Sequence, residues 1–214
     1  IKGSEITLFS PSDVPGLYEA FFADQDKFEE LYVKYEQDPT IRKRTVKAVE
    51  IFSLVMQERA STGRIYIQNV DHCNTHSPFD PQVAPVRQSN LCLEIALPTK
   101  PLQHINDENG EIALCTLSAF NLGKIENLDE LEELADLAVR SLDALLDYQD
   151  YPVVAAKRSS LARRSLGIGV INYAYYLAKN GVRYSDGSAN DLTHRTFEAI
   201  QYYVLKASMN LAKE

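Results

Sequence analysis

Apolar residues recur every three or four positions over long stretches of this chain, and this spacing predicts amphipathic helices. The clearest helix starts after Asn127, because Glu130 follows it at the spacing of a capping box. The apolar stripe of this helix comprises Leu128, Leu131, Leu134, Leu137, Ala138, Leu142 and Leu145. Several such helices, separated by few strand-like runs, predict a mostly helical chain of the α/β class.

Helical spacing also marks other parts of the chain. Ser12 or Asp13 can cap a first helix that has Pro15 in its first turn. Further helices are predicted over about 24–37, 41–62, 170–179 and 191–214. Gly63 suits the position just after the helix at 41–62, because glycine readily adopts the left-handed backbone found there. Most of the 12 tyrosines are interpreted as packing residues on helical faces.

Strand-like composition is confined to short runs. Residues 64–68 alternate and are β-rich, and residues 111–121 form an apolar run typical of a buried strand. Residues 69–89 contain three prolines and predict a long ordered loop, a kind of segment that is often functional. Residues 90–97 are apolar with polar interruptions. So few strands cannot close a sheet or barrel by themselves, and we expect the chain to be part of a larger fold.

Composition excludes several classes of function. The formal net charge is -8, whereas phosphate binding needs clustered Lys and Arg, so no nucleic-acid partner is expected. No apolar run approaches the roughly 20 residues of a membrane span, and no signal peptide opens the chain. The three cysteines are widely spaced and unlike a disulfide scaffold, which favours a reducing, cytoplasmic setting. The chain starts at Ile1 and ends within a helical pattern, so we expect a piece of a longer protein.

Residues 88–94 are the segment most suited to chemistry. They place an amide, a thiol and a carboxylate at alternate positions, namely Asn90, Cys92 and Glu94. Alternate residues of an extended segment point to the same side, so these three would form a reactive face while the apolar residues between them anchor the other side in a core. A thiol beside an acid–base carboxylate and an amide suits a small polar substrate. The alternative is an inert, buried cysteine beside an unrelated Asn and Glu.

The segment Ser-Asn-Leu-Cys-Leu-Glu-Ile at 89–95, followed by Leu-Pro-Thr at 97–99, resembles the finger-loop motif of class I ribonucleotide reductase large subunits. The segment Ala-Leu-Cys-Thr-Leu-Ser-Ala-Phe-Asn-Leu at 113–122 resembles the second cysteine strand of that family. Residues 58–64 and 163–169 also match, so the resemblance covers essentially the whole chain. The chain looks most like the bacterial enzymes that use an iron-tyrosyl small subunit.

This resemblance implies a fold. The family has a ten-stranded α/β barrel made of two half-barrels, with a finger loop through its centre. Residues 1–214 would be a partial catalytic barrel domain, with Cys92 at the tip of the loop. The N-terminal nucleotide-binding cone, the specificity loops and the C-terminal tail of the family would lie outside this chain.

The resemblance also implies an activity, the reduction of ribonucleoside diphosphates to deoxyribonucleoside diphosphates, which supplies DNA precursors. Cys92 would carry the thiyl radical that abstracts the 3′ hydrogen of the ribose. Glu94 would be the general base at the 3′ hydroxyl, and Asn90 would hydrogen-bond the substrate beside Ser89. Cys115 would be one of two redox-active thiols that reduce the substrate and end as a disulfide.

The resemblance places the cofactor and most partners outside this chain. No metal or cofactor is expected in this segment, because a di-iron tyrosyl radical would reside in a small radical-generating subunit. ATP or deoxynucleotide effectors would bind elsewhere in the large subunit. A second large subunit and thioredoxin or glutaredoxin would complete the assembly. The isolated chain lacks the second reducing cysteine and the radical path, so the alternative is a non-catalytic sub-fragment that is inactive alone.

Weaker signals have structural interpretations. His72, Cys73 and His76 lack further ligands at zinc-site spacing, so a metal is disfavoured. Gly-Ile-Gly at 167–169 lacks the third glycine of a dinucleotide fingerprint and is interpreted as a close-packing point next to a helix start. The Arg-Arg pair at 163–164 is interpreted as solvated. The absence of a Cys-x-x-Cys motif disfavours a small thiol oxidoreductase.

Overall fold

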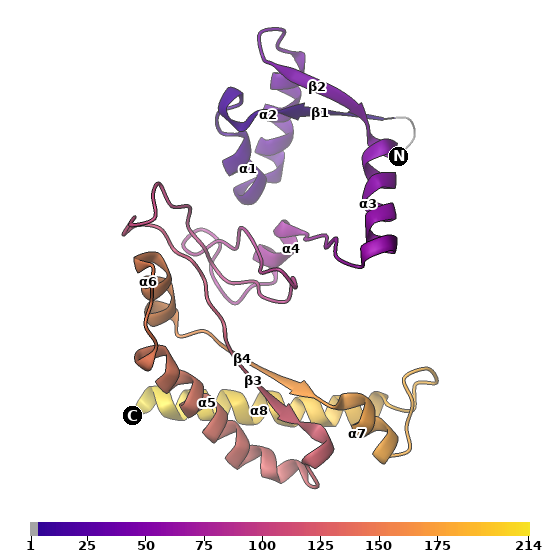
Figure 1. Ribbon diagram of the computed structural model, residues 1–214, viewed down its shortest axis with the longest axis vertical. Coiled ribbons are helices and arrows are strands. Elements are labelled where there is room, and N and C mark those ends of the chain that lie inside the picture. Colours follow the sequence, from indigo (N-terminus) through magenta and orange to yellow (C-terminus); the bar gives the residue numbers. More distant parts are fainter. Residues whose placement is uncertain (1–3) are drawn as a thin grey trace. The chain divides into compact units, whose positions relative to one another are not determined.

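The computed structural model describes residues 4–214, which contain helices and strands and fall into two compact units (Figure 1). The first unit extends to Pro101, and the second runs from Leu102 to Glu214. The prediction of a mixed chain that is mostly helical is confirmed. Over the described residues, no helix combines the length and the apolar character needed to cross a lipid bilayer.

The first unit combines a two-stranded antiparallel sheet with helices. In chain order its elements are β1 (Glu5–Phe9), the 3-10 helix η1 (Pro11–Asp13), α1 (Leu17–Ala23), α2 (Gln25–Gln37), β2 (Lys43–Lys47), α3 (Ala48–Thr62) and α4 (Val70–Thr75). β1 pairs with β2, and Val14, Leu17 and Tyr35 form a buried core beside them. The Tyr32 hydroxyl on α2 bonds to both the N–H and the carbonyl of Thr7, so α2 is tied to β1.

The helix predictions at the N-terminal end need correction. Residues 43–47, expected to be helical, form β2 because they pair with β1 along its whole length, and the pairing overrides the local helical pattern. The first helix starts after Gly16, whose φ of +82° suits glycine, and not after Ser12 or Asp13. The helix predicted over 24–37 is confirmed, and the Asp24 side chain caps it by accepting the Lys27 N–H (2.9 Å).

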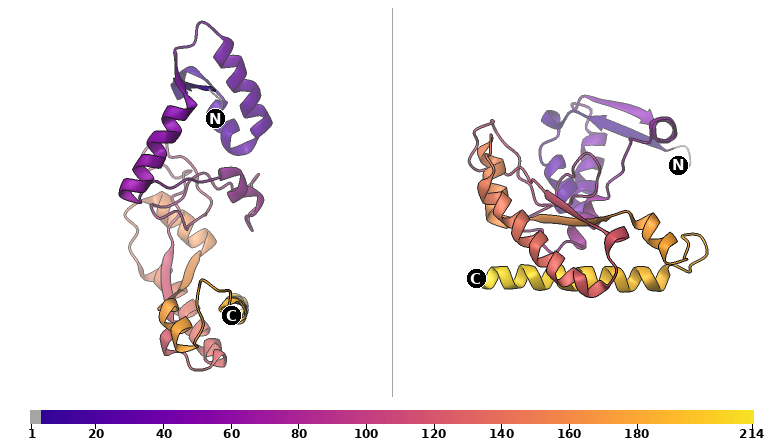
Figure 2. Two further views of the ribbon diagram at one scale, coloured as in Figure 1. Left: turned by 90° about the vertical axis from the view of Figure 1, so that its right-hand side faces the viewer. Right: turned by 60° about the horizontal axis from the view of Figure 1, so that its bottom comes forward.

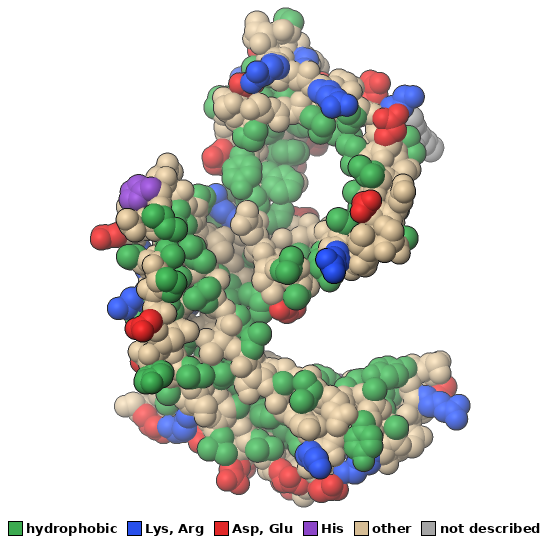
Figure 3. Space-filling model, in the orientation of Figure 1, with side chains coloured by type: hydrophobic (Ala, Val, Ile, Leu, Met, Phe, Trp, Pro, Cys, Tyr) green, Lys and Arg blue, Asp and Glu red, His purple; other side chains and the backbone are tan. Residues whose placement is uncertain are grey.

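α3 ends at Thr62, and the φ of +66° at Gly63 confirms the predicted role of this glycine just after the helix. None of the side chains of α3 is buried, and Val49, Phe52 and Leu54 are exposed. Hydrophobic side chains are accordingly visible at the surface along this helix (Figure 3). Such a surface on a helix usually packs against further protein.

The segment that follows α3 differs from its predictions. Residues 64–68 form no strand, because the described residues offer them no neighbouring strand to pair with. The loop predicted over 69–89 contains α4, whose buried Asn74 organises the rest. The Asn74 side chain donates to the Val86 carbonyl (2.8 Å) and accepts the Val86 N–H (2.8 Å). This amide therefore satisfies both backbone polar groups of the buried Val86, just before residues 88–94.

The second unit is a β-helix-helix-β arrangement followed by two further helices. In chain order its elements are β3 (Thr116–Asn121), the 3-10 helices η2 (Leu122–Lys124) and η3 (Leu128–Glu130), α5 (Leu131–Tyr148), α6 (Val154–Arg163), β4 (Leu166–Ile171), α7 (Tyr173–Lys179) and α8 (Asn190–Lys213). β3 and β4 are parallel, with Thr116 opposite Leu166 and Asn121 opposite Ile171. α5 and α8 lie side by side against this strand pair (Figure 2).

The core of the second unit lies between the two strands and these helices. Phe120 of β3 packs with Leu131 and Ala135 of α5, with Ile200 of α8 and with Ile168 of β4. Successive strand residues point to opposite faces, so the alternate positions form a second face. Leu117 and Ile171 on that second face are exposed within the unit. The helices of the unit therefore cover one face of the strand pair.

Most element predictions for this unit are confirmed, with shifts. The capping box of Asn127 and Glu130 is present, and one 3-10 turn precedes α5. The apolar stripe is partly wrong, because Leu134, Leu137 and Leu145 are exposed while other side chains face the core. The buried residues of α5 are Leu131, Ala135, Val139, Leu142 and Leu146.

The strand boundaries and one helix also differ from the predictions. The strand predicted over 111–121 begins at Thr116, since only from there does it pair with β4. Residues 167–169 lie inside β4 rather than beside a helix start, and the helix predicted over 170–179 begins at Tyr173. α6 was not predicted, because its sequence has little helical amphipathicity. The helix predicted over 191–214 is confirmed as α8.

Candidate active site

Cys92 lies in a tight turn of the first unit. The Leu93 N–H donates to the Asn90 carbonyl (3.1 Å), which folds residues 90–93 back on themselves. Leu93 has a φ of +66°, in the left-handed region that is strained for a leucine. Leu91 and Cys92 are both exposed, so the tip of the turn presents the thiol.

The residues that flank the turn bind one another. Asn90 Nδ2 donates to Glu94 Oε1 (2.6 Å), and Asn90 Oδ1 accepts the Ile95 N–H (3.2 Å). Ser89 Oγ donates to the Ile95 carbonyl (2.6 Å). These bonds close the base of the loop, and Cys92 lies midway along the chain between the amide and the carboxylate.

The prediction of an extended segment with one reactive face is wrong in its geometry. Leu91 is 89% exposed and anchors no core in the first unit, although Leu93 and Ile95 are partly buried. Local bonds from the Asn90 side chain to nearby backbone compete with an extended conformation and favour the turn. The structure nevertheless brings Asn90 and Glu94 together, across a turn rather than along a strand.

Cys115 belongs to the second unit, directly before β3. It is partly buried, and none of the cysteines, all of which lie in the described part of the chain, forms a disulfide. The thiol lies beside Gly167 of β4, since a Cβ atom at that glycine would be 2.6 Å from Cys115 Sγ. Cys115 is on the same face of the strand as Leu117, which is the face opposite the helices.

The segment that leads to Cys115 is held against α6. The guanidinium of Arg158 donates to the Glu108 carbonyl. The Ile112 N–H donates to the Ala155 carbonyl (3.3 Å). These contacts cannot be predicted from the local sequence, because each joins residues that are some 40 to 50 positions apart in the chain.

Both residues of the Arg-Arg pair form ion pairs, so their interpretation as solvated is wrong. Arg163 Nη1 lies 2.6 Å from Glu111 Oε2, and their side chains are only 18% and 7% exposed. Arg164 binds Asp143 (2.5 Å) and Asp147 (2.8 Å) on α5. Hydrogen bonds to these two carboxylates raise the pKa of Arg164, and the bond from Arg164 lowers the pKa of Asp147. The end of α6 is therefore fixed to α5 and to the segment before Cys115.

The residues considered for a metal have other contacts. The His72 and His76 rings meet edge to face with their centroids 5.9 Å apart, and Gln68 Nε2 donates to Cys73 Sγ (3.4 Å). Among residues 4–214, no group of three or more His, Cys, Asp or Glu side chains is placed to hold a metal ion.

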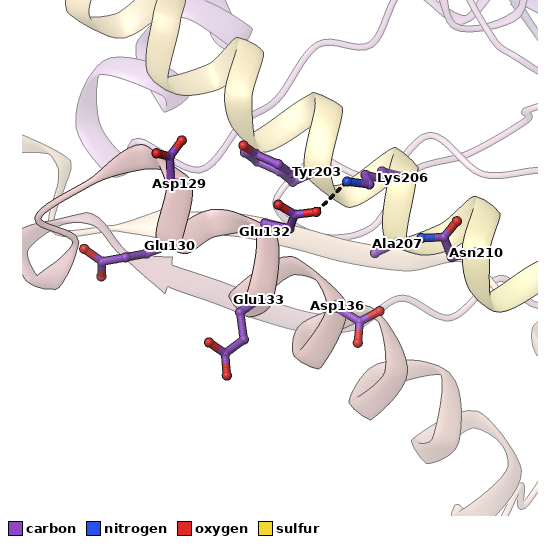
Figure 4. Close-up of a pocket in the computed structure, with 9 residues that line it drawn as sticks. All are labelled: Asp129, Glu130, Glu132, Glu133, Asp136, Tyr203, Lys206, Ala207 and Asn210. Atoms are coloured by element: carbon purple, nitrogen blue, oxygen red, sulfur yellow. Dashed lines mark hydrogen bonds and ion pairs between the residues drawn. The ribbon is translucent and has the colours of Figure 1, made fainter.

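An acid-rich pocket lies between α5 and α8 (Figure 4). Glu132 of α5 pairs with Lys206 of α8 across it, and this bond raises the pKa of Lys206. Asp129 and Asp136 also line the pocket. The ion pair joins the two helices, and we interpret the pocket as part of their packing.

Comparisons with known proteins cover the whole chain. The family model described as ribonucleotide reductase, barrel domain, matches residues 1–214. The ribonucleoside-diphosphate reductase subunit alpha of Haemophilus influenzae is 99% identical over 214 residues, and the ribonucleoside-diphosphate reductase 1 subunit alpha of Escherichia coli is 82% identical. The subunit alpha of Enterobacteria phage T4 is 52% identical over 216 residues. Each comparison covers 100% of this chain and 28% of the length of the relative.

Proposed function

Because the chain belongs to the ribonucleotide reductase family, whose barrel domain it matches over its whole length, we propose that it forms the substrate-reducing centre of a large subunit. In that subunit, ribonucleoside diphosphates are reduced to deoxyribonucleoside diphosphates. The proposal includes the ten-stranded barrel with a central finger loop, of which residues 89–95 are the loop.

The observation that carries this proposal is the 2.6 Å hydrogen bond between Asn90 and Glu94 on either side of Cys92. It gathers an amide and a carboxylate at the base of a turn whose tip bears a thiol. A carboxylate at this place can accept the proton of a substrate hydroxyl while the sulfur exchanges a hydrogen atom. We assign the C3′ hydrogen abstraction to the Cys92 thiyl radical, the 3′ hydroxyl proton to Glu94, and substrate binding to Asn90 and Ser89.

Cys115 supplies one of the two thiols that reduce the substrate. In this step two thiols give up two hydrogen atoms and form a disulfide. One hydrogen replaces the 2′ hydroxyl on the ribose and the other leaves with that hydroxyl as water, so the step balances. The second thiol belongs to a part of the large subunit outside this chain, and thioredoxin or glutaredoxin restores both thiols by disulfide exchange. The partly buried Cys115 in its thiol form suits this role.

The parallel pair of β3 and β4 supports the barrel assignment. Parallel sheets are usually covered on both faces, but the helices of the second unit cover one. The other face bears Cys115 and the exposed side chains of Leu117 and Ile171. In the complete barrel this face is the interior, where a reducing thiol meets the substrate.

The oxidising equivalent originates outside this chain. We place it in a small subunit that carries a di-iron tyrosyl radical. ATP and deoxynucleotide effectors bind elsewhere in the large subunit, which pairs with a second copy, and the whole assembly is cytoplasmic. The residues of this chain contribute the thiols, the base and the substrate contacts.

Turnover by the complete large subunit, assayed with the small subunit and a thioredoxin system, tests these roles. Cys92→Ser and Cys115→Ser are expected to abolish deoxynucleotide formation. Glu94→Gln is expected to lower kcat by about 10² to 10⁴, the usual contribution of a general base. Cys73→Ser is the matched control, because the Cys73 thiol accepts a hydrogen bond from Gln68 and has no role in the proposed chemistry, and it should retain wild-type kcat.

Continued turnover by Cys92→Ser would remove the radical assignment. The isolated 214-residue chain distinguishes the non-catalytic alternative. If this chain is a sub-fragment that binds nothing alone, a nucleoside diphosphate leaves its melting temperature unchanged, whereas an intact substrate site raises it.

A further inference from the structure

Gly167 has no side chain at a point where two other side chains need the space. A Cβ atom at this position would lie 2.6 Å from Cys115 Sγ and 2.5 Å from Leu117 Cδ2. Carbon atoms in contact normally stay about 3.5 to 4.0 Å apart, so any residue larger than glycine would displace its neighbours.

The backbone does not explain this glycine. Within residues 4–214, positive φ angles are found at Gly16, Gly63, Gly181 and Gly187, and not at Gly167. It pairs with Leu117 inside a regular parallel ladder, where other residues are usually preferred to glycine. The neighbouring side chains therefore account for its lack of a side chain.

Gly169 provides the contrast within the same strand. It points to the same face two residues later, and a Cβ atom there would meet nothing within 4 Å. The steric requirement is therefore local to the position opposite Leu117 and next to Cys115.

Of the two neighbours, the thiol is the one with less freedom to move. Leu117 is 64% exposed and can swing the end of its side chain away from β4. The sulfur of Cys115 is one bond from Cβ, so its position changes only by a jump of χ1 or by movement of the backbone.

We propose that Gly167 is a positioning residue for Cys115, forming the recess in β4 that holds the thiol in one orientation. The consequence for catalysis rests on the proposed function, in which Cys115 reduces the substrate. The orientation of the Cys115 thiol can be tested independently of that proposed function.

The test compares Gly167→Ala with Gly169→Ala in the complete large subunit. The first readout is the iodoacetamide alkylation rate of each cysteine, followed by peptide mass spectrometry, with Cys73 as the internal reference. Because the added methyl group pushes the sulfur out of its recess, Gly167→Ala should alkylate at Cys115 at least about threefold faster than wild type. Gly169→Ala should match wild type.

The second readout is steady-state turnover. In Gly167→Ala the sulfur of Cys115 is displaced by a fraction of its own diameter, and because the reaction depends on its position, kcat should fall about tenfold or more. KM for the nucleoside diphosphate should stay unchanged. Wild-type alkylation and kcat in Gly167→Ala, with Cys115→Ser inactive, would overturn the positioning role and leave the proposed function standing. If Cys115→Ser is active and alkylation of Cys115 is altered in Gly167→Ala, the positioning role stands and the proposed function of Cys115 is wrong.

Double variants decide the matter if Gly167→Ala fails to fold. Cys115→Ala in the same chain removes the sulfur and should restore folding. If Leu117→Ala restores it and Cys115→Ala does not, the recess serves the leucine and the proposal is wrong.

Discussion

The ion pair between Glu111 and Arg163 should be one of the strongest local constraints on the approach to Cys115. Its atoms are 2.6 Å apart, and the side chains are 7% and 18% exposed. Glu111→Gln keeps the size of the side chain but leaves the Arg163 charge without its carboxylate. Removing one partner of a buried pair costs about 3 to 5 kcal/mol. Arg163 keeps some contact with solvent, so we expect the lower figure, about 3 kcal/mol.

Hydrogen exchange in the complete large subunit measures this change where it occurs. Peptides that cover residues 108–121 and α6 report local opening, and about 3 kcal/mol corresponds to more than a hundredfold faster exchange when reclosing is fast. The Ile112 amide, which bonds to Ala155, should show the effect most directly. Alkylation of Cys115 should also quicken, because the preceding segment is released from α6.

Asp136→Asn is the matched control, since it breaks an exposed arginine–carboxylate pair on α5. Such pairs contribute about 0 to 1 kcal/mol. The single variant Arg163→Met and the double variant Glu111→Gln/Arg163→Met complete a double-mutant cycle. The double variant should lose less free energy of local opening than the sum of the losses in the two single variants. If Glu111→Gln exchanges no faster than Asp136→Asn, the pair does not hold the segment and the reasoning from burial is refuted.

Further predictions concern the loop, the capping box and pH. Leu93→Ile should lower turnover of the complete subunit, because a β-branched residue at φ +66° adds about 1 to 3 kcal/mol of strain, whereas Leu97→Ile should not. Asn127→Ala should cost about 1 kcal/mol and speed amide exchange at Asp129 in η3 about fivefold, and unchanged exchange would argue against the cap. The backbone N–H groups of Gln103 and Asn109 lower the pKa of Asp107, so its stabilisation of loop 103–109 is complete above the unfolded pKa of about 4 and is lost as pH falls through the lower folded pKa. Amide exchange in loop 103–109 should therefore become faster, relative to the intrinsic rate, when the wild type is taken below the folded pKa of Asp107, and Asp107→Asn should show this faster exchange already at neutral pH. Wild-type protection of the loop that does not change with pH would contradict this.

The sequence predicted elements well where a single segment decides its own structure. The Asn127 capping box, the Gly63 terminus and α8 depend on residues that are neighbours in the chain, and all are confirmed. β2 and the missing strand at 64–68 depend on whether another strand lies alongside, which local composition does not encode. Pairing between distant segments is therefore one of the places where the fold predictions failed.

The candidate site divides along the same line. Asn90, Cys92 and Glu94 are close in sequence, so their association could be predicted even though the turn that creates it was expected to be a strand. The surroundings of Cys115 come from β4 and α6, about 50 residues further along the chain. The close packing predicted for residues 167–169 is confirmed at Gly167, but nothing in the local sequence indicates that Cys115 is the neighbour there or that Arg163 binds Glu111. A reactive side chain can thus be found from a short motif, whereas the residues that hold it in place come from packing between distant elements. Substitutions at Gly167 and Glu111 are consequently the informative ones, because they leave Asn90, Cys92, Glu94 and Cys115 intact and change what surrounds the Cys115 thiol.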